Sequence, residues 1–225
     1  MREEKVRSFG EYHDAISRYE WFERWMFRGQ IDASWPLIPK IGRKKYKYAL
    51  KDERSFFRAW KRQAVAYFSR DTIDDWDYLA LAQHHGLATR LLDWTRNPLV
   101  ALFFAVHENY DRDGVVFVFK PKHHYVQDDA PHPLKVDKTG YFTPHSFSER
   151  IVQQRGVFTV HKSPSFELGD KDGELHKYII PKDIKPQLSK DLNNYGINMM
   201  TLFPGLDGLS DFMNWQAAIL KGFEE

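Results

Sequence analysis

Sixteen residues, Gln83–Pro98, hold most of the closely spaced side chains in this chain that could do chemistry. The stretch reads QHHGLATRLLDWTRNP, and the apolar run LVALFFAV follows it directly. If a helix ends at the two histidines, their side chains point about 100° apart, so His84 and His85 do not bind one metal ion. One of them then serves as a core or capping residue, and the other as a hydrogen-bond donor or proton carrier near neutral pH. No H-x-x-x-H spacing and no cysteine is present, so we expect no metal site.

The same stretch places charged residues among leucines. A buried arginine and a buried aspartate are tolerated when they are paired, so Asp93 is predicted to be the structural partner of Arg90. Alternatively, Thr89 and Arg90 face a pocket and Asp93 orients them. Trp94 either stacks on a ligand ring or fills the core. We expect this segment to line a pocket, and the apolar helix predicted after it to hold the pocket rigidly.

A second candidate is the sequence FRGQ, which contains Arg28, Gly29 and Gln30. An arginine at a strand end can offer its fork of donors to a diphosphate or a carboxylate. The adjacent glycine would permit a tight turn or the close approach of a ligand. The alternative is a structural ion pair. We predict that one concave pocket is lined by residues far apart in sequence, namely Arg28, Thr89, Arg90 and either Gln153 or Gln154.

Charge is unevenly distributed along the 225 residues. The net charge is +2, but residues 28–70 contain twelve Lys or Arg and three acids, a balance of +9 that leaves −7 for the rest. A basic lobe of this kind is typical of phosphate or nucleic-acid binding. A solvated helix surface is the alternative. The side chains expected to contact nucleic acid are Arg43, Lys44, Lys45, Lys47, Lys61 and Arg62.

Composition and pattern predict one α+β domain over residues 1–225. Hydrophobic residues make up 42%, there is no cysteine, and no apolar run is long enough to cross a membrane, so we expect a cytoplasmic protein without a membrane partner. A basic helical lobe, about 28–70, is expected to pack on a core of about 71–225 with a small mixed β-sheet. Helices are predicted after Ser8, over 52–69 and 75–85, from Pro98, over 184–196 and over 209–223; strands are predicted over 25–30, 114–121, 151–162 and 175–181.

Several of these motifs together resemble the FRG-domain family of bacterial and phage proteins. The similar segments are FRGQ, WPLIPKIGR, QHHGLATRLLDWTRNPLVALFFA, RIVQQRGVFTVH and the later LFPGLDGLS. Members often belong to toxin or antiviral defence contexts. The resemblance therefore implies a toxin or phage-defence effector whose partners include an antitoxin or another defence-system protein.

The order of three sequence motifs is also similar, more distantly, to that in an ADP-ribosyltransferase. Arg28 and Gly29 match that family's first strand, and Thr89 or Thr95 matches the strand that leads into an Ala/Phe-containing helix. The third motif, a later strand with a catalytic glutamate, departs from the pattern. Gln153 and Gln154 stand where the glutamate signature is usual, and Glu149 lies upstream. The likeness implies an enzyme that uses NAD as a substrate and modifies RNA, DNA or protein. Its catalytic residues would be Arg28, His84, Thr89 and Gln154, and its ligand contacts Gly29, Gln30, His85, Arg90, Trp94 and Gln153.

Two other function classes fit the same residues. One is a non-catalytic module that binds a nucleotide or a nucleic acid. The other is a metal-independent nuclease that uses His84 or His85 with Arg28. The chain has neither a G-x-G-x-x-G after a strand nor a G-x-x-x-x-G-K-[ST] motif, so neither a Rossmann site nor a P-loop is predicted.

Overall fold

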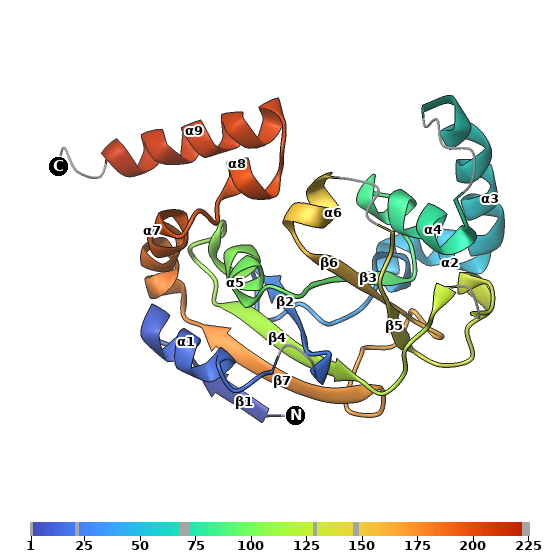
Figure 1. The fold of residues 1–225 in the computed structure, drawn as a ribbon, viewed down its shortest axis with the longest axis horizontal. Coiled ribbons are helices and arrows are strands. Elements are labelled where there is room, and N and C mark those ends of the chain that lie inside the picture. Colours follow the sequence, from blue (N-terminus) through green and yellow to red (C-terminus); the bar gives the residue numbers. More distant parts are fainter. Residues whose placement is uncertain (1, 21–22, 68–72, 128–129, 146–148, 222–225) are drawn as a thin grey trace.

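The computed structural model describes residues 2–20, 23–67, 73–127, 130–145 and 149–221. Within these residues the strands form one curled seven-stranded sheet with helices on both sides, which confirms the α+β class (Figure 1). The strand order is β1-β7-β4-β2-β3-β6-β5; β1 and β7 are parallel, and all other neighbours are antiparallel. The strands are β1 (Arg2–Lys5), β2 (Met26–Gln30), β3 (Leu91–Thr95), β4 (Gly114–Pro121), β5 (Gly140–Phe142), β6 (Gly156–Val160) and β7 (Gly173–Ile180).

Local signals set the helix ends. The Ser8 hydroxyl accepts a hydrogen bond from the Glu11 amide and begins α1, and Asn97 caps α5 ahead of Pro98, both as predicted. Gly86, with a φ of 86°, follows the end of α4. No helix in the described ranges combines the length and apolar character needed to span a membrane. The helices are α1 (Phe9–Ile16), α2 (Lys47–Lys51), α3 (Glu53–Ala64), α4 (Asp75–His84), α5 (Pro98–Val106), α6 (Glu149–Gln153), α7 (Lys185–Asn194), α8 (Met199–Leu202) and α9 (Leu206–Lys221).

The structure corrects some predicted elements. Ile151–Gln153 belong to helix α6 rather than to a strand, because this segment buries only Ile151 and the chain then turns at Arg155, which has a φ of 46°. The helix predicted over 52–69 is α3, which ends at Ala64, and Tyr67 beyond it is 91% exposed. Strands β1 and β5 and helices α2 and α8 were not predicted, and β3 was expected only from the ADP-ribosyltransferase likeness. Residues 68–69 and 222–223, the ends of two predicted helices, lie outside the described residues.

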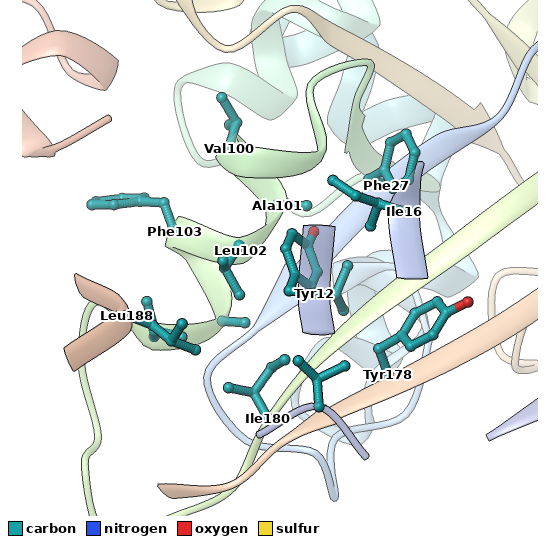
Figure 2. Close-up of a cluster of buried hydrophobic side chains, with 14 of the residues drawn as sticks. Tyr12, Ile16, Phe27, Val100, Ala101, Leu102, Phe103, Tyr178, Ile180 and Leu188 are labelled. Atoms are coloured by element: carbon teal, nitrogen blue, oxygen red, sulfur yellow. The ribbon is translucent and has the colours of Figure 1, made fainter. Parts of the chain in front are cut away.

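Helix α5 forms the centre of the larger core (Figure 2). With α1 and α7 it covers one face of β7, β4 and β2, where Tyr12, Leu102 and Ile180 are fully or nearly fully buried. Gly29 lies within β2, so no turn forms there. A Cβ at this position would lie 1.9 Å from the carbonyl oxygen of Ala101, so the close approach that the glycine allows is that of the α5 backbone.

Helices α3 and α4 cover the second half of the sheet. Phe57 of α3 and Trp76 of α4 pack with Phe142 and Phe158 of β5 and β6. The remaining strand side chains, Trp94 among them, meet across the inner face of the curled sheet. The predicted site residues therefore come to lie where the two halves of the sheet join, between β2 and β3.

Candidate functional site

The site lies where the sheet parts between β2 and β3. As described, these two strands pair at a single position, Phe27 with Thr95, whereas β2 pairs with β4 at five positions. Beyond that pair, Arg28 Nη1 donates to the carbonyl oxygen of Asp93 at 2.7 Å. A cavity of about 270 Å³ opens at this parting. Its lining comes from β2, β3, β6 and the adjoining helices: Phe27, Arg28, Gly29, Gln83, His84, Asp93, Trp94, Thr95, Phe104, Arg150, Ile151, Gln154, Gly156, Val157 and Phe158.

Arg28 lies in this cavity and has hydrogen-bond donors that the described residues do not use. Its side chain is 16% exposed, Nη1 lies 3.7 Å from the Asp93 carboxylate, and none of the described residues accepts a hydrogen bond from its buried Nε. Burial and the nearby Arg43 lower the pKa of Arg28, which the Asp93 carboxylate opposes. A guanidinium stays charged in proteins, so this one can bind two oxygen atoms of an anion.

A chain of hydrogen bonds orients Asp93. Thr89 Oγ1 donates to Gln83 Oε1 at 2.6 Å, and Gln83 Nε2 donates to Asp93 Oδ2 at 3.1 Å. Thr89 is 1% exposed and lies outside the cavity lining, so it positions Gln83 and does not contact a ligand. Gln83 belongs to the segment that was expected to line a pocket, as do Thr89 and Asp93, but no role was predicted for Gln83 itself.

Arg90 does not pair with Asp93, and it does not line the cavity. Arg90 Nη2 lies 2.5 Å from Glu53 Oε2, and Nη1 donates to the carbonyl oxygen of His161. Along an extended chain, residues three apart point to opposite faces, so the predicted Arg90–Asp93 pair is wrong. Asp93 is 57% exposed and supplies the carboxylate of the cavity instead.

His84 and Arg150 both line the cavity. Burial, followed by the charge of Arg150, lowers the pKa of His84 to about 4 despite the opposing effect of Asp93, so the imidazole is neutral at pH 7. The Arg150 guanidinium lies 4.3 Å from the ring centre of Phe203. Arg150 was missed by sequence reasoning because the residues directly after it, 151–162, were predicted to be a strand, which hid the helix α6 that carries it. His85 is exposed and lies outside the lining.

The two glutamines of the QQ pair have different positions. Gln154 lines the cavity; its Nε2 donates to the carbonyl oxygen of Leu202, and its backbone oxygen accepts from Thr95 Oγ1 at 2.6 Å. Gln153 is exposed and lies outside the lining. Of the two candidate threonines, therefore, Thr95 reaches the cavity wall and Thr89 does not.

Two other predicted ligand contacts are held by the scaffold. Trp94 Nε1 donates to Thr159 at 2.9 Å, and the Trp94 ring stacks on Phe119, so its aromatic face belongs to the core. Gln30 is 4% exposed and donates to the carbonyl oxygen of Trp35. Trp94 borders the cavity, but its ring and the Gln30 side chain are both engaged within the protein.

A second cavity of about 590 Å³ adjoins the first, because both are lined by His84 and Arg150. Its far wall is the segment Phe203–Gly208, and Glu149 also contributes. The FPGLDG sequence, noted for its resemblance to a family ending, thus forms part of the same groove. A ligand could extend from Arg28 past Arg150 to this segment.

The basic lobe borders the site. Lys40 Nζ donates to the carbonyl oxygen of Gly86 at 2.7 Å, and the Ile41 amide donates to that of Thr89. Lys61 forms an ion pair with Asp75 and so is engaged within the protein. The other five predicted nucleic-acid contacts are exposed: Arg43, Lys44, Lys45, Lys47 and Arg62.

Among the described residues, no group of three His, Asp or Glu side chains could hold a metal ion. The family model of the FRG domain matches residues 23–114, which confirms the recognised resemblance over that range. The matched range contains Arg28, the lobe, the motif from Gln83 to Asp93 and α5, whereas Arg150 and Gln154 lie beyond it. No curated protein and no solved structure matches the chain.

Proposed function

We propose that the cavity between β2 and β3 binds NAD and that the protein is an ADP-ribosyltransferase-like enzyme, acting on a nucleic acid or a protein in a toxin or defence context. The observation that carries this proposal is the pairing of a buried arginine, with an unsatisfied Nε, and an oriented carboxylate across a parted sheet. The arginine suits a diphosphate, and the carboxylate suits a developing positive charge on a ribose.

The two arginines divide the binding of the diphosphate. Arg28 enters from β2 and Arg150 from α6, and both line the first cavity. The neutral His84 in the same lining adds no charge and can act as a hydrogen-bond donor or acceptor to a sugar hydroxyl or an amide. Taken together, the two adjoining cavities of about 270 and 590 Å³ fall within the size range of small-molecule sites, about 300–1,000 Å³, so a dinucleotide can extend through both.

The reaction uses one carboxylate in the cavity. The bond between ribose C1′ and the nicotinamide nitrogen breaks, and nicotinamide leaves with the bonding electron pair. Asp93, held by Gln83, stabilises the cationic ribose and takes the proton of the acceptor as its oxygen or nitrogen bonds to C1′. The products are nicotinamide, the ADP-ribosylated acceptor and one proton, which Asp93 releases to solvent. Asp93 thereby takes the role of the glutamate that is usual in ADP-ribosyltransferases and that is absent at Gln153 and Gln154.

The test is release of nicotinamide from NAD, measured by chromatography with and without RNA, DNA or a cell protein extract as acceptor. The wild-type chain should release nicotinamide, and Arg28→Gln and Asp93→Asn should each lower the rate by about 100-fold or more. His13→Gln, an exposed change on α1, is the matched control and should leave the rate unchanged. Melting temperatures should confirm that all variants fold.

The outcomes separate the function classes. Equal rates for Arg28→Gln, Asp93→Asn and wild type would overturn the assigned roles. NAD binding that depends on Arg28 but gives no nicotinamide with any acceptor would replace the enzyme with a non-catalytic nucleotide-binding module. The absence of both binding and release would overturn the assignment of the cavity to NAD.

A further inference from the structure

Residues 40–62 of the basic lobe carry many cations, and two charged side chains of this segment, Glu53 and Lys61, form ion pairs with residues outside the lobe. Glu53 is only 8% exposed and pairs with Arg90 of the core rather than with a cation of the lobe. Lys61 pairs with Asp75 of α4. Both ion pairs attach the lobe to the core. They leave Asp52 as the exposed acid of this segment, beside exposed lysines and arginines.

Aromatic rings stand among these cations. Tyr48 is 70% exposed and Phe56 is 52% exposed, although a ring of this size usually contributes most of its area to a core. Lys47 Nζ lies 5.1 Å and Lys51 Nζ 5.8 Å from the ring centre of Tyr48. Tyr46 has Lys40 and Lys45 around it in the same way, each at 5.8 Å.

We propose that this surface binds single-stranded nucleic acid, with phosphates on the lysines and bases stacked on Tyr48 and Phe56. Alternation of cations and exposed rings suits a single strand because its bases offer free faces for stacking. A duplex keeps its bases stacked on one another, so it would use the charges alone. The surface thus has a chemical reason to prefer a single strand over a duplex.

The bound strand would run toward the cavity. Arg43, at the edge of the lobe, is close enough to Arg28 to lower its pKa, and Lys40 contacts the turn at Gly86. A strand on the lobe would therefore place its sugar or base beside the proposed NAD site, as an acceptor. Binding itself does not depend on NAD, so it is measured in its absence and can succeed or fail separately from the proposed reaction.

The experiment measures fluorescence anisotropy of labelled oligothymidylate, oligouridylate and a duplex of equal length, without NAD. The double variant Tyr48→Ala/Phe56→Ala should weaken single-strand binding by about fivefold or more per ring and leave duplex binding nearly unchanged. Tyr110→Ala is the matched control, since Tyr110 is an exposed tyrosine (42%) outside the lobe, and it should bind as wild type. Both rings are exposed, so folding should be preserved.

A charge variant tests the other half of the proposal. Lys44→Glu/Lys45→Glu should weaken single-strand and duplex binding alike and reduce the slope of log affinity against log salt by roughly 1.4 for the single strand, about 0.7 per phosphate contact. The proposal is overturned if the ring variant binds single strands like wild type, if duplex and single strand lose affinity equally when the rings are removed, or if wild type binds no oligonucleotide at low salt.

Discussion

Breaking the ion pair between Glu53 and Arg90 should destabilise the fold more than any change to a cavity charge. Their side chains are 9% and 11% exposed, and Arg90 donates to both carboxylate oxygens. Arg90→Ala leaves Glu53 as a buried, unpaired charge, which costs about 3–5 kcal/mol. For a domain of this size each kcal/mol lowers the melting temperature by about 2–4 °C, so the expected loss is about 6–20 °C.

The assay is thermal unfolding by circular dichroism, together with urea unfolding for the free energy. Asp93→Asn is the comparison, because its carboxylate is 57% exposed and its pairing with Arg28 should contribute about 1 kcal/mol or less. The double variant Glu53→Leu/Arg90→Met should recover much of the loss, since apolar replacement of a whole buried pair is often neutral. An Arg90→Ala protein that melts like Asp93→Asn would refute the reasoning.

Gly29→Ala should lower the free energy of unfolding, measured in urea, by about 1–3 kcal/mol, because its Cβ would collide with the α5 backbone. Gly10→Ala in α1 is the control, since its Cβ meets nothing closer than 3.9 Å, and it should be neutral or stabilising. Equal stabilities for these two variants would contradict the packing argument. His161 is 2% exposed, and burial with the nearby Arg90 lowers its pKa to about 3. The unfolded chain therefore binds this proton first, so stability should fall as pH drops from about 6.5 toward 3, and urea titrations of His161→Gln should show a smaller fall.

Where a single residue type decides the local structure, the sequence was sufficient to predict the end of a helix or strand. Ser8 and Asn97 cap helices by side-chain oxygens, and Gly86 adopts a positive φ after α4, all of which follow from short-range stereochemistry. The continuous apolar run Gly114–Pro121 is a strand with the predicted ends. These signals concern a few neighbouring residues, and tertiary packing does not override them.

The site was only partly predictable, because partners come from distant segments. Arg28, His84 and Gln154 do line one cavity, although Gly29 beside Arg28 forms no turn and packs against α5 instead. Nothing near Arg90 in the sequence marks Glu53 as its partner, since α3 is brought to β3 only by the fold. Arg150 was missed for the related reason that a β-branched pair resembled a strand and hid the helix that presents its guanidinium.

The single pair between β2 and β3 also has a consequence for local opening. Four strands, β1-β7-β4-β2, lie on one side of it, and three, β3-β6-β5, lie on the other. Separating the halves breaks one register pair, whereas separating β4 from β7 breaks eight. Amide hydrogen exchange should therefore reveal two cooperative units with different opening free energies. A ligand that contacts Arg28 on one half and Arg150 on the other would add a further link between them, and its binding should slow exchange in both units together.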